Sequence, residues 1–202
     1  MTTVFKDKSH DALPTTVLTE IDGDITLTGK ITTPNGYSVR NVKLTLKKGN
    51  TIISTLMTDG VYTFSNLDAN ETYTIEIENN SDQFNGVTTF DMATIAWSIL
   101  NVFPFENNYN LMAANVSEVD TDNSTVDVMD ILLIRKFILR QLPALPGNTW
   151  NFIPSNYQFS TVAPNFPKPQ PMSQSFTIKT ASSPIEFNFI GIKEGDVNGT
   201  AR

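Results

Sequence analysis

Apolar residues recur at every second position in four short runs between residues 25 and 79. This alternation is typical of β-strands that bury one face, and threonines occupy many of the intervening positions, as expected for a solvated outer face. Turn-forming sequences such as Pro34-Asn35-Gly36 and Asp59-Gly60 separate the runs. Short strands at this spacing predict a small antiparallel β-sandwich. The apolar positions are Ile25, Leu27 and Ile31; Val42, Leu44 and Leu46; Tyr62 and Phe64; and Tyr73, Ile75 and Ile77.

Two later segments, residues 91–100 and 130–139, place apolar residues three or four positions apart, which predicts two amphipathic helices. The segments superpose at a shift of 39 residues, so the chain contains an internal repeat. Each copy begins with a capping pattern, Thr88-x-x-Asp91 or Asp127-x-x-Asp130, whose side chains can bond to free backbone N–H groups. The matched pairs are Val87 with Val126, Asp91 with Asp130, Ile95 with Ile134, Ile99 with Ile138 and Leu100 with Leu139.

The C-terminal third returns to β-structure. Prolines 143 and 146 end the second helix, an aromatic stretch at 149–159 is strand-like, and alternation reappears from Phe176 and again from Ile185. We therefore divide the chain into an N-terminal tail (1–20), a β-sandwich (21–80), a helical repeat (81–142) and an aromatic, proline-rich segment with C-terminal strands that pack on the rest (143–202). The predicted fold class is mainly β with a small α part.

The residue composition excludes several classes of catalytic and metal-binding site. The 202 residues include no cysteine and one histidine, His10, in a polar N-terminal stretch, so catalytic triads, thiolate nucleophiles and cysteine- or histidine-based metal sites are excluded. A net charge of -7 without a Lys/Arg-rich stretch argues against nucleic acid as a partner. No apolar run reaches membrane-spanning length and the start does not look like a signal peptide. We expect a soluble chain that is cytoplasmic, or whose export signal has been removed or lies outside this sequence.

The stretch Thr58-Asp-Gly-Val-Tyr62-Thr-Phe64-Ser-Asn-Leu67, followed by Tyr73-Thr-Ile75, resembles the signature of transthyretin-like sandwiches in Cna B-type and carboxypeptidase regulatory-like repeats. In those modules a tight Asp-Gly turn precedes a strand whose Tyr and Phe enter the core. The resemblance covers residues 21–80 and implies an Ig/transthyretin-like sandwich.

The repeat between residues 80 and 142 resembles type I dockerin. Val126-x-x-x-Asp130 with the following helix and its basic pair, Arg135 and Lys136, matches the end of a dockerin calcium loop, and residues 85–91 match the other copy. The closing sequence Gly195-Asp-Val-Asn-Gly199 is similar to the start of such a loop. The whole order resembles a module of large surface proteins secreted by Bacteroidetes-type bacteria, which implies a location outside the cell or on its surface.

An EF-type calcium loop needs oxygen ligands at positions 1, 3, 5, 7 and 12. Counting back from Asp91 gives Asn80, Asp82 and the Gly86 carbonyl, but Phe84 at position 5. Counting back from Asp130 puts Val119 at position 1, while Asp120 and Asp122 are one residue too close. The second loop is therefore degenerate, and its candidates, which require a detour of the backbone, are Asn115, Asp120, Asp122 and Asp127.

A composite site would supply the missing ligands if Asp196 and Asn198 lay beside Asp91 or Asp130. In the alternative interpretation, Asp91 and Asp130 are helix N-terminal carboxylates stabilised by the helix dipole, at about 0.3–1 kcal/mol each. We predict at least one bound calcium ion.

The expected function is a non-catalytic extracellular module for adhesion or assembly, which binds a protein partner or copies of itself. Arg135 and Lys136 are candidates for partner binding, or form the solvated side of a helix. Trp97, Trp150 and the aromatic residues of 150–159 either join the parts of the molecule or stack on a glycan. The alternatives are a self-polymerising fibre subunit and a carbohydrate-binding module. No motif singles out a carboxylate pair for a glycoside hydrolase, so we expect no enzyme.

Overall fold

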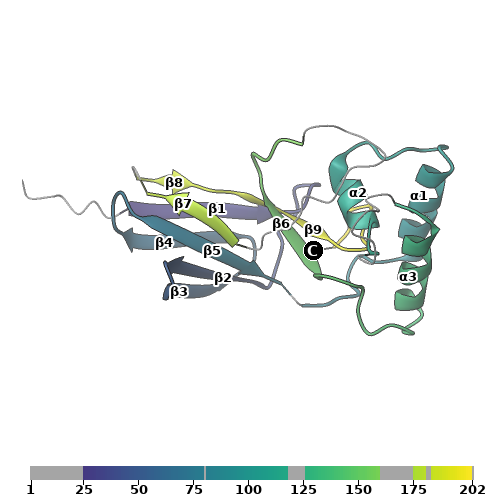
Figure 1. Cartoon of the computed structure of the whole chain (residues 1–202), viewed down its shortest axis with the longest axis horizontal. Coiled ribbons are helices and arrows are strands. Elements are labelled where there is room, and N and C mark those ends of the chain that lie inside the picture. Colours follow the sequence, from purple (N-terminus) through teal and green to yellow (C-terminus); the bar gives the residue numbers. More distant parts are fainter. Residues whose placement is uncertain (1–24, 80, 118–125, 160–174, 181–182, 202) are drawn as a thin grey trace, which may run out of the picture.

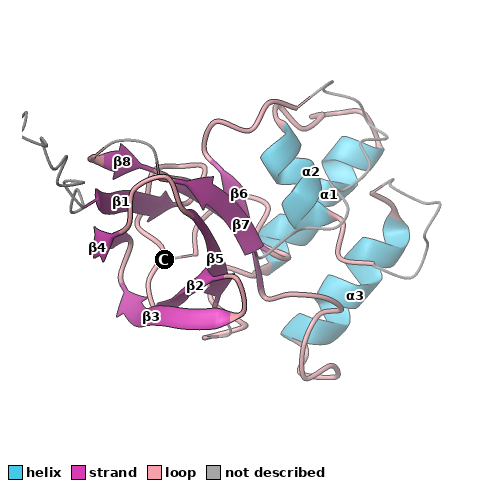
Figure 2. Ribbon diagram, turned by 60° about the vertical axis from the view of Figure 1, so that its left-hand side comes forward, coloured by secondary structure: helices cyan, strands magenta, loops and turns pink. Residues whose placement is uncertain are grey.

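The computed structural model describes residues 25–79, 81–117, 126–159, 175–180 and 183–201. Strands occupy one end of the molecule and helices the other, with β6 and β9 between them (Figure 1). All the labelled helices lie on the same side of the strands (Figure 2). The predicted N-terminal tail lies outside the described residues. In the described residues, the predicted fold class, mainly β with a small α part, is confirmed.

The strands form two sheets. The first has the order β4-β1-β9-β6, with β8 also paired to β1, and the second has the order β3-β2-β5-β7. The members of the first sheet are β1 (Ile25–Thr32), β4 (Val61–Leu67), β6 (Trp150–Pro154), β8 (Ile185–Glu186) and β9 (Phe189–Lys193). Those of the second are β2 (Val42–Lys48), β3 (Thr51–Thr58), β5 (Thr72–Glu78) and β7 (Ser175–Lys179).

The sheets differ from the predicted antiparallel sandwich of residues 21–80 in strand orientation and in the strands that belong to them. The second sheet is antiparallel throughout, but β9 and β8 run parallel to β1, so the first sheet is mixed. Parallel pairing of β1 with β9 is possible because a long stretch of chain connects these two strands. Strand β9 comes from the far end of the chain and enters the sheet beside β1. The C-terminal strands therefore join both sheets: β7 pairs with β5, and β9 lies in the middle of the first sheet.

One buried apolar cluster lies between the two sheets, as in a β-sandwich. The alternating residues expected from the sequence are in it: all of them are at most 4% exposed. Leu27 of β1 is the register partner of Phe64 of β4. The ring centroids of Tyr62 and Phe189 lie 6.3 Å apart. Burial of this cluster is the main source of stability for the strands.

Three helices form the second part of the molecule: α1 (Thr89–Ile99), α2 (Asn108–Ala114) and α3 (Val128–Ile138). The repeated segments are helical, as predicted, and α1 packs against α3. Helix α2 was not predicted, because its seven residues are too short to show a helical period. Ile95 and Ile134, one from each repeat, are fully buried in a second apolar cluster.

Strands β6 and β9 connect the two clusters. Phe152 and Phe189 point into the sandwich cluster, whereas Ile153 and Ile192 belong to the helical cluster. Because successive side chains of a strand point to opposite faces, one pair of strands serves both clusters. The helices are thereby fixed against the first sheet.

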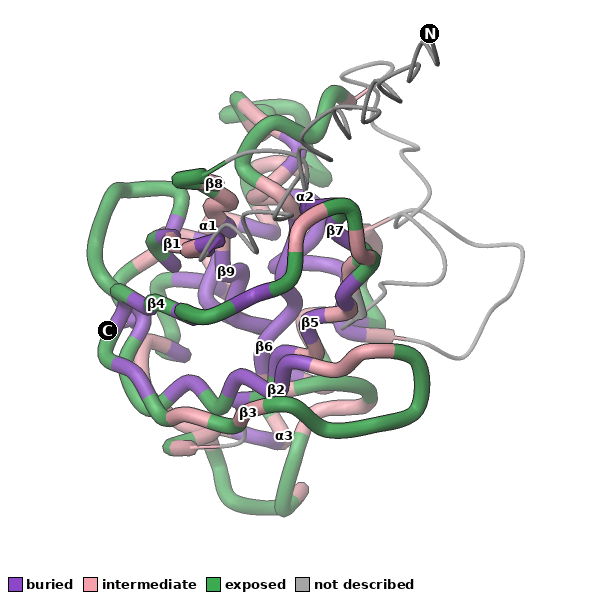
Figure 3. The backbone as a smooth tube through the Cα atoms, turned by 90° about the vertical axis from the view of Figure 1, so that its left-hand side faces the viewer, coloured by how far each residue is buried: buried purple, intermediate pink, exposed green. Residues whose placement is uncertain are grey.

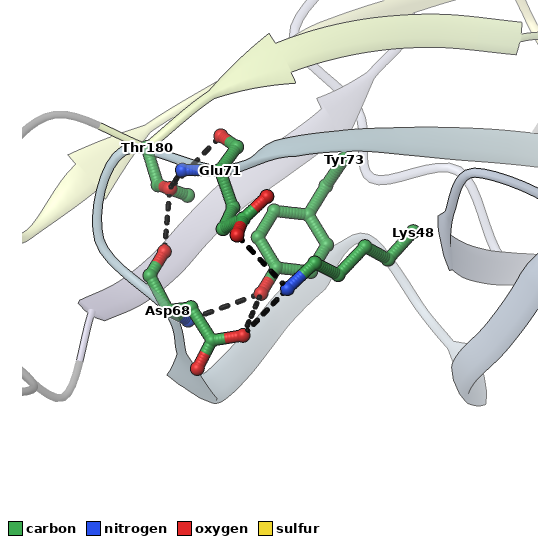
Figure 4. A network of polar contacts seen from close by, with 5 residues as sticks. All are labelled: Lys48, Asp68, Glu71, Tyr73 and Thr180. Atoms are coloured by element: carbon green, nitrogen blue, oxygen red, sulfur yellow. Dashed lines mark hydrogen bonds and ion pairs between the residues drawn. The ribbon is translucent and has the colours of Figure 1, made fainter.

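A polar network joins the β4–β5 turn to its neighbours (Figure 4), at the end of the sandwich away from the helices (Figure 1). Lys48 pairs with Asp68 and Glu71, at 2.9 and 3.2 Å. The Thr180 hydroxyl, at the end of β7, donates to the Asp68 carbonyl at 2.6 Å, and the Asp68 N–H donates to the Tyr73 hydroxyl at 3.0 Å. The network holds the β4–β5 turn to β7, so its role is structural.

None of the helices in the described part of the chain combines the length and the apolar character that crossing a bilayer requires.

Candidate metal centre

Each long helix begins with a buried aspartate that is held by its own first turn. Asp91 Oδ2 accepts hydrogen bonds from the backbone N–H of Thr88 at 2.8 Å and from its hydroxyl at 2.9 Å. Asp127 and Asp130 form the same capping box at α3. Both predicted capping patterns are confirmed, and both Asp91 and Asp130 are fully buried. Burial of a carboxylate requires such compensation by hydrogen bonds.

The segment that follows β9 returns to the start of α1. The backbone N–H of Asn198 donates to Asp91 Oδ1 at 3.2 Å. Asp196 lies in the same loop, where its Oδ1 accepts from the N–H of Thr200 at 3.0 Å and its Oδ2 from the N–H of Ala201 at 2.7 Å. The loop that carries Asp196 and Asn198 therefore lies beside Asp91 and not beside Asp130, and Asp91 is close enough for its charge to act on Asp196.

Gly86 lets the two segments approach closely. Its carbonyl accepts a hydrogen bond from the Thr200 hydroxyl at 3.3 Å. A Cβ atom added to Gly86 would lie 2.7 Å from the Ala201 nitrogen and 2.8 Å from Asp196 Cγ, and its φ of +82° also favours glycine. No larger residue fits here without moving the C-terminal segment.

The donor atoms at this place suit a hard cation. Asn198 Oδ1 is buried and has no hydrogen-bond partner within the described ranges, although buried polar atoms are almost always paired. The neighbouring residues Asp91, Asp196 and Gly86 offer two carboxylates and a backbone carbonyl in the same region. Calcium takes six to eight oxygen ligands, including waters, so the residues fit this ion. Among the described residues no group of three or more His, Cys, Asp or Glu side chains gathers.

The electrostatics of this region follow from burial. Desolvation raises the pKa of both Asp91 and Asp196, and the charge of Asp91 raises that of Asp196 further, while backbone N–H groups act in the opposite direction. Lys193, on β9, is also buried and donates to the Gln83 carbonyl at 2.8 Å. Burial lowers the pKa of its ammonium group to about 8, against the charges of Asp196, Glu194 and Asp82.

The start of α3 has an arrangement like that at the start of α1. Asp130 Oδ1 accepts from the N–H groups of Val116 and Ser117, each at 2.9 Å, as Asp91 accepts from the C-terminal segment. Asn115 corresponds to Asp196 of the site at Asp91. Its buried Oδ1 has no hydrogen-bond partner in the part of the chain that is described. The sequence carries a signal for this correspondence, because Asn115-Val-Ser117 matches Asp196-Val-Asn198.

Helix α2 holds the C-terminal segment from its other side. The N–H of Gly195 donates to the Ala113 carbonyl at 2.8 Å, and the Asn110 side chain donates to the Val197 carbonyl at 2.7 Å. Val197 is buried in the helical cluster. The loop that carries Asp196 and Asn198 is therefore fixed at both sides.

The other predicted ligands are placed differently. Asp82 is exposed, and its charge acts on Lys193. Phe84, at the predicted position 5, stacks on Phe137 at 4.2 Å and lies under the guanidinium group of Arg140. Asn80, Asp120 and Asp122 lie outside the described residues, so their part in a site stays a prediction.

The remaining candidates are not among the oxygen donors of this centre. Trp150 and Phe152 are buried in the sandwich cluster, where they join the parts of the molecule. Trp97 is 39% exposed on α1. Arg135 is exposed and Lys136 is half-buried, both in the last turn of α3, where a positive charge complements the helix dipole.

Comparison with known proteins finds no family model that matches this chain, and no curated protein that is similar to it.

Proposed function

We propose that the chain is a non-catalytic structural and interaction module of an extracellular or cell-surface protein, in which calcium joins the C-terminal segment to the start of α1. The observation that carries the proposal is the hydrogen bond from the Asn198 N–H to Asp91, which brings Asp196 and the buried, unpaired Asn198 Oδ1 to the start of α1. In this proposal the sandwich is of the transthyretin-like kind and the helical repeat is dockerin-like.

The chain's own residues give the site an architectural role. The oxygens of Asp91 and Asp196 accept backbone N–H groups, so each carboxylate fixes the path of the chain. Two buried negative charges so close together repel each other, and a bound divalent cation would offset that repulsion. The ligands would be Asp91, Asp196, Asn198 and the Gly86 carbonyl. A second ion at Asp130 and Asn115 is proposed on the same pattern.

Exposed apolar side chains on the helices support the interaction part of the proposal. Trp97 packs edge-on against both Phe90 and Phe103, and these two phenylalanines are 55% and 65% exposed. Apolar surface of this kind marks a place where another protein binds. The exposed apolar residues of α1, α3 and the segments that follow them include Phe90, Trp97, Leu100, Val102, Phe103, Val128, Met129, Leu132 and Leu139. Arg135, on α3, would add a charged contact.

A carbohydrate-binding role has less support than a protein partner. Trp150 and Phe152 are at most 4% exposed, so neither ring is available to stack on a sugar. Trp97 and Tyr157 remain as exposed rings of the predicted set, at 39% and 40%.

Isothermal titration calorimetry with calcium tests the metal site. We expect binding to the unaltered chain, with a rise in the thermal unfolding midpoint, and loss of the first site in Asp196→Ala and in Asn198→Ala. The exposed Glu106 is a matched control, because Glu106→Ala removes a carboxylate without touching the site. Calcium binding that is unchanged in both site variants, or absent from the unaltered chain, would refute the proposal.

Labelling of intact cells with an antibody against the chain tests the proposed location. Signal on intact cells supports a surface module, whereas signal only after lysis contradicts it.

A further inference from the structure

Strand β3 forms one edge of the second sheet. It pairs with β2 on one side, and no strand of the described residues pairs with it on the other. The strand is eight residues long, and Figure 3 shows it on the outside of the molecule, exposed over most of its length. An edge of this kind offers a row of backbone N–H and C=O groups to another strand.

The composition of β3 favours such pairing. Its sequence, Thr51-Ile-Ile-Ser-Thr-Leu-Met-Thr58, contains no charged residue and no proline, which are two of the usual means of blocking an edge. Ile52 and Met57 are 60% and 64% exposed. A break in register beside Ile53 leaves Ser54–Thr58 as the regular part of the edge.

The other edges of the sandwich are better protected. Strand β7, the opposite edge of the second sheet, buries Ile178 and exposes Thr177 and the charged Lys179. Strand β6 is buried over four of its five residues. Strand β4 exposes mainly polar side chains, such as Thr63 and Ser65. The apolar character is therefore a particular property of β3.

The charges behind β3 identify the kind of strand that fits. Each lysine of β2 is paired with an acid: Lys43 with Glu78, Lys47 with Glu76, and Lys48 with Asp68 and Glu71. These pairs compensate the lysine charges of the sheet beside this edge, although the chain as a whole carries a net charge of -7. The partner that matches it is an uncharged, apolar strand, and a second copy of the chain supplies such a strand without bringing like charges together.

We propose that two copies of the chain associate through β3, with the strands antiparallel about a twofold axis. The two four-stranded sheets then form one continuous sheet, and the exposed Met57 of each copy is covered. A twofold contact is closed, so the product is a dimer. This contact lies on the sandwich and is independent of the calcium site.

Because the chain has no cysteine, single cysteines report the contact directly. Thr55→Cys and Met57→Cys each place one thiol on the outer face of β3, and Thr63→Cys places one on β4 as the matched control. We expect oxidation to give disulfide-linked dimers from at least one β3 variant and none from the control. Equal cross-linking in all three overturns the proposal.

Sedimentation of the full chain over a concentration series gives the independent measurement. We expect a monomer–dimer equilibrium that Met57→Lys weakens by about tenfold or more, since a buried unpaired ammonium group costs over 1.4 kcal/mol. Val128→Lys, on α3, and Leu18→Lys, in the N-terminal segment, should leave it unchanged. Dimers lost in Val128→Lys or Leu18→Lys but kept in Met57→Lys would assign the contact to the helices or to that segment. A chain that stays monomeric up to about 1 mM would exclude the dimer.

Discussion

Substitution of Gly86 by alanine tests how the two halves of the proposed metal centre fit together. The new methyl group would lie 2.7 Å from the Ala201 nitrogen and 2.8 Å from Asp196 Cγ. Both distances are below those that carbon atoms adopt, so the C-terminal segment has to move away from α1. Gly36 provides a matched control, because its φ of +83° is almost that of Gly86 and a Cβ atom there meets nothing within 4 Å.

The magnitudes follow from these two environments. Both substitutions force an alanine into left-handed backbone, at a cost of about 1 kcal/mol in the free energy of unfolding. Only Gly86→Ala adds overpacking, for a further 1–3 kcal/mol or so. We therefore expect losses of about 1 kcal/mol for Gly36→Ala and about 2–4 kcal/mol for Gly86→Ala.

Urea denaturation without calcium, followed by calcium titration of the folded variants, checks both consequences. Gly86→Ala should also bind calcium more weakly, since Asp196 is displaced from Asp91, whereas Gly36→Ala should bind like the unaltered chain. Equal losses of stability in the two variants, together with unchanged calcium affinity, would refute the close approach of these segments.

Three further predictions concern the rest of the molecule. Ile134→Ala should cost about 2–5 kcal/mol in urea denaturation because the side chain is fully buried, whereas exposed Leu139→Ala should stay within about 0.5 kcal/mol. Burial lowers the pKa of Lys193 to about 8, so the folded state releases this proton before the unfolded state, whose value is 10.5. The free energy of unfolding in calcium-free solution should therefore gain a contribution that rises with pH between about 8 and 10.5, and Lys193→Met should lack it. Tyr62→Phe removes the hydroxyl that donates to the Phe187 carbonyl, and should lower the free energy of unfolding by about 1 kcal/mol, measured by the same urea assay.

The alternating residues of β1, β2, β4 and β5 could be predicted because each strand has one face in the core. Strand β3 could not, since as an edge strand it exposes Ile52 and Met57 and shows no alternation to read. The parallel placement of β9 beside β1 depends on contacts between the two ends of the sequence, which local patterns do not encode. Helix α2 was too short for its period to be recognised.

The candidate metal centre was partly predictable, because local spacing identifies some of its residues, whereas only the tertiary structure brings the others beside them. The capping aspartates Asp91 and Asp130 stand at fixed spacings in the sequence and were found. The placement of Asp196 and Asn198 was a hypothesis with two possible neighbours, and only the tertiary structure selects Asp91. The equivalence of Asn115 to Asp196 was hidden by the different lengths of chain that separate each from its helix.

The position of β9 has a consequence for how the protein is made. Its neighbours β1 and β6 leave the ribosome well before it, so the first sheet has a gap in its centre until residues 189–193 emerge. Both apolar clusters are incomplete until this strand is present, because Phe189 belongs to the sandwich cluster and Ile192 to the helical cluster. Contacts so distant in sequence form slowly. We therefore expect nascent chains that stop short of β9 to stay sensitive to protease, and the sandwich and helices to become resistant together once it has been synthesised.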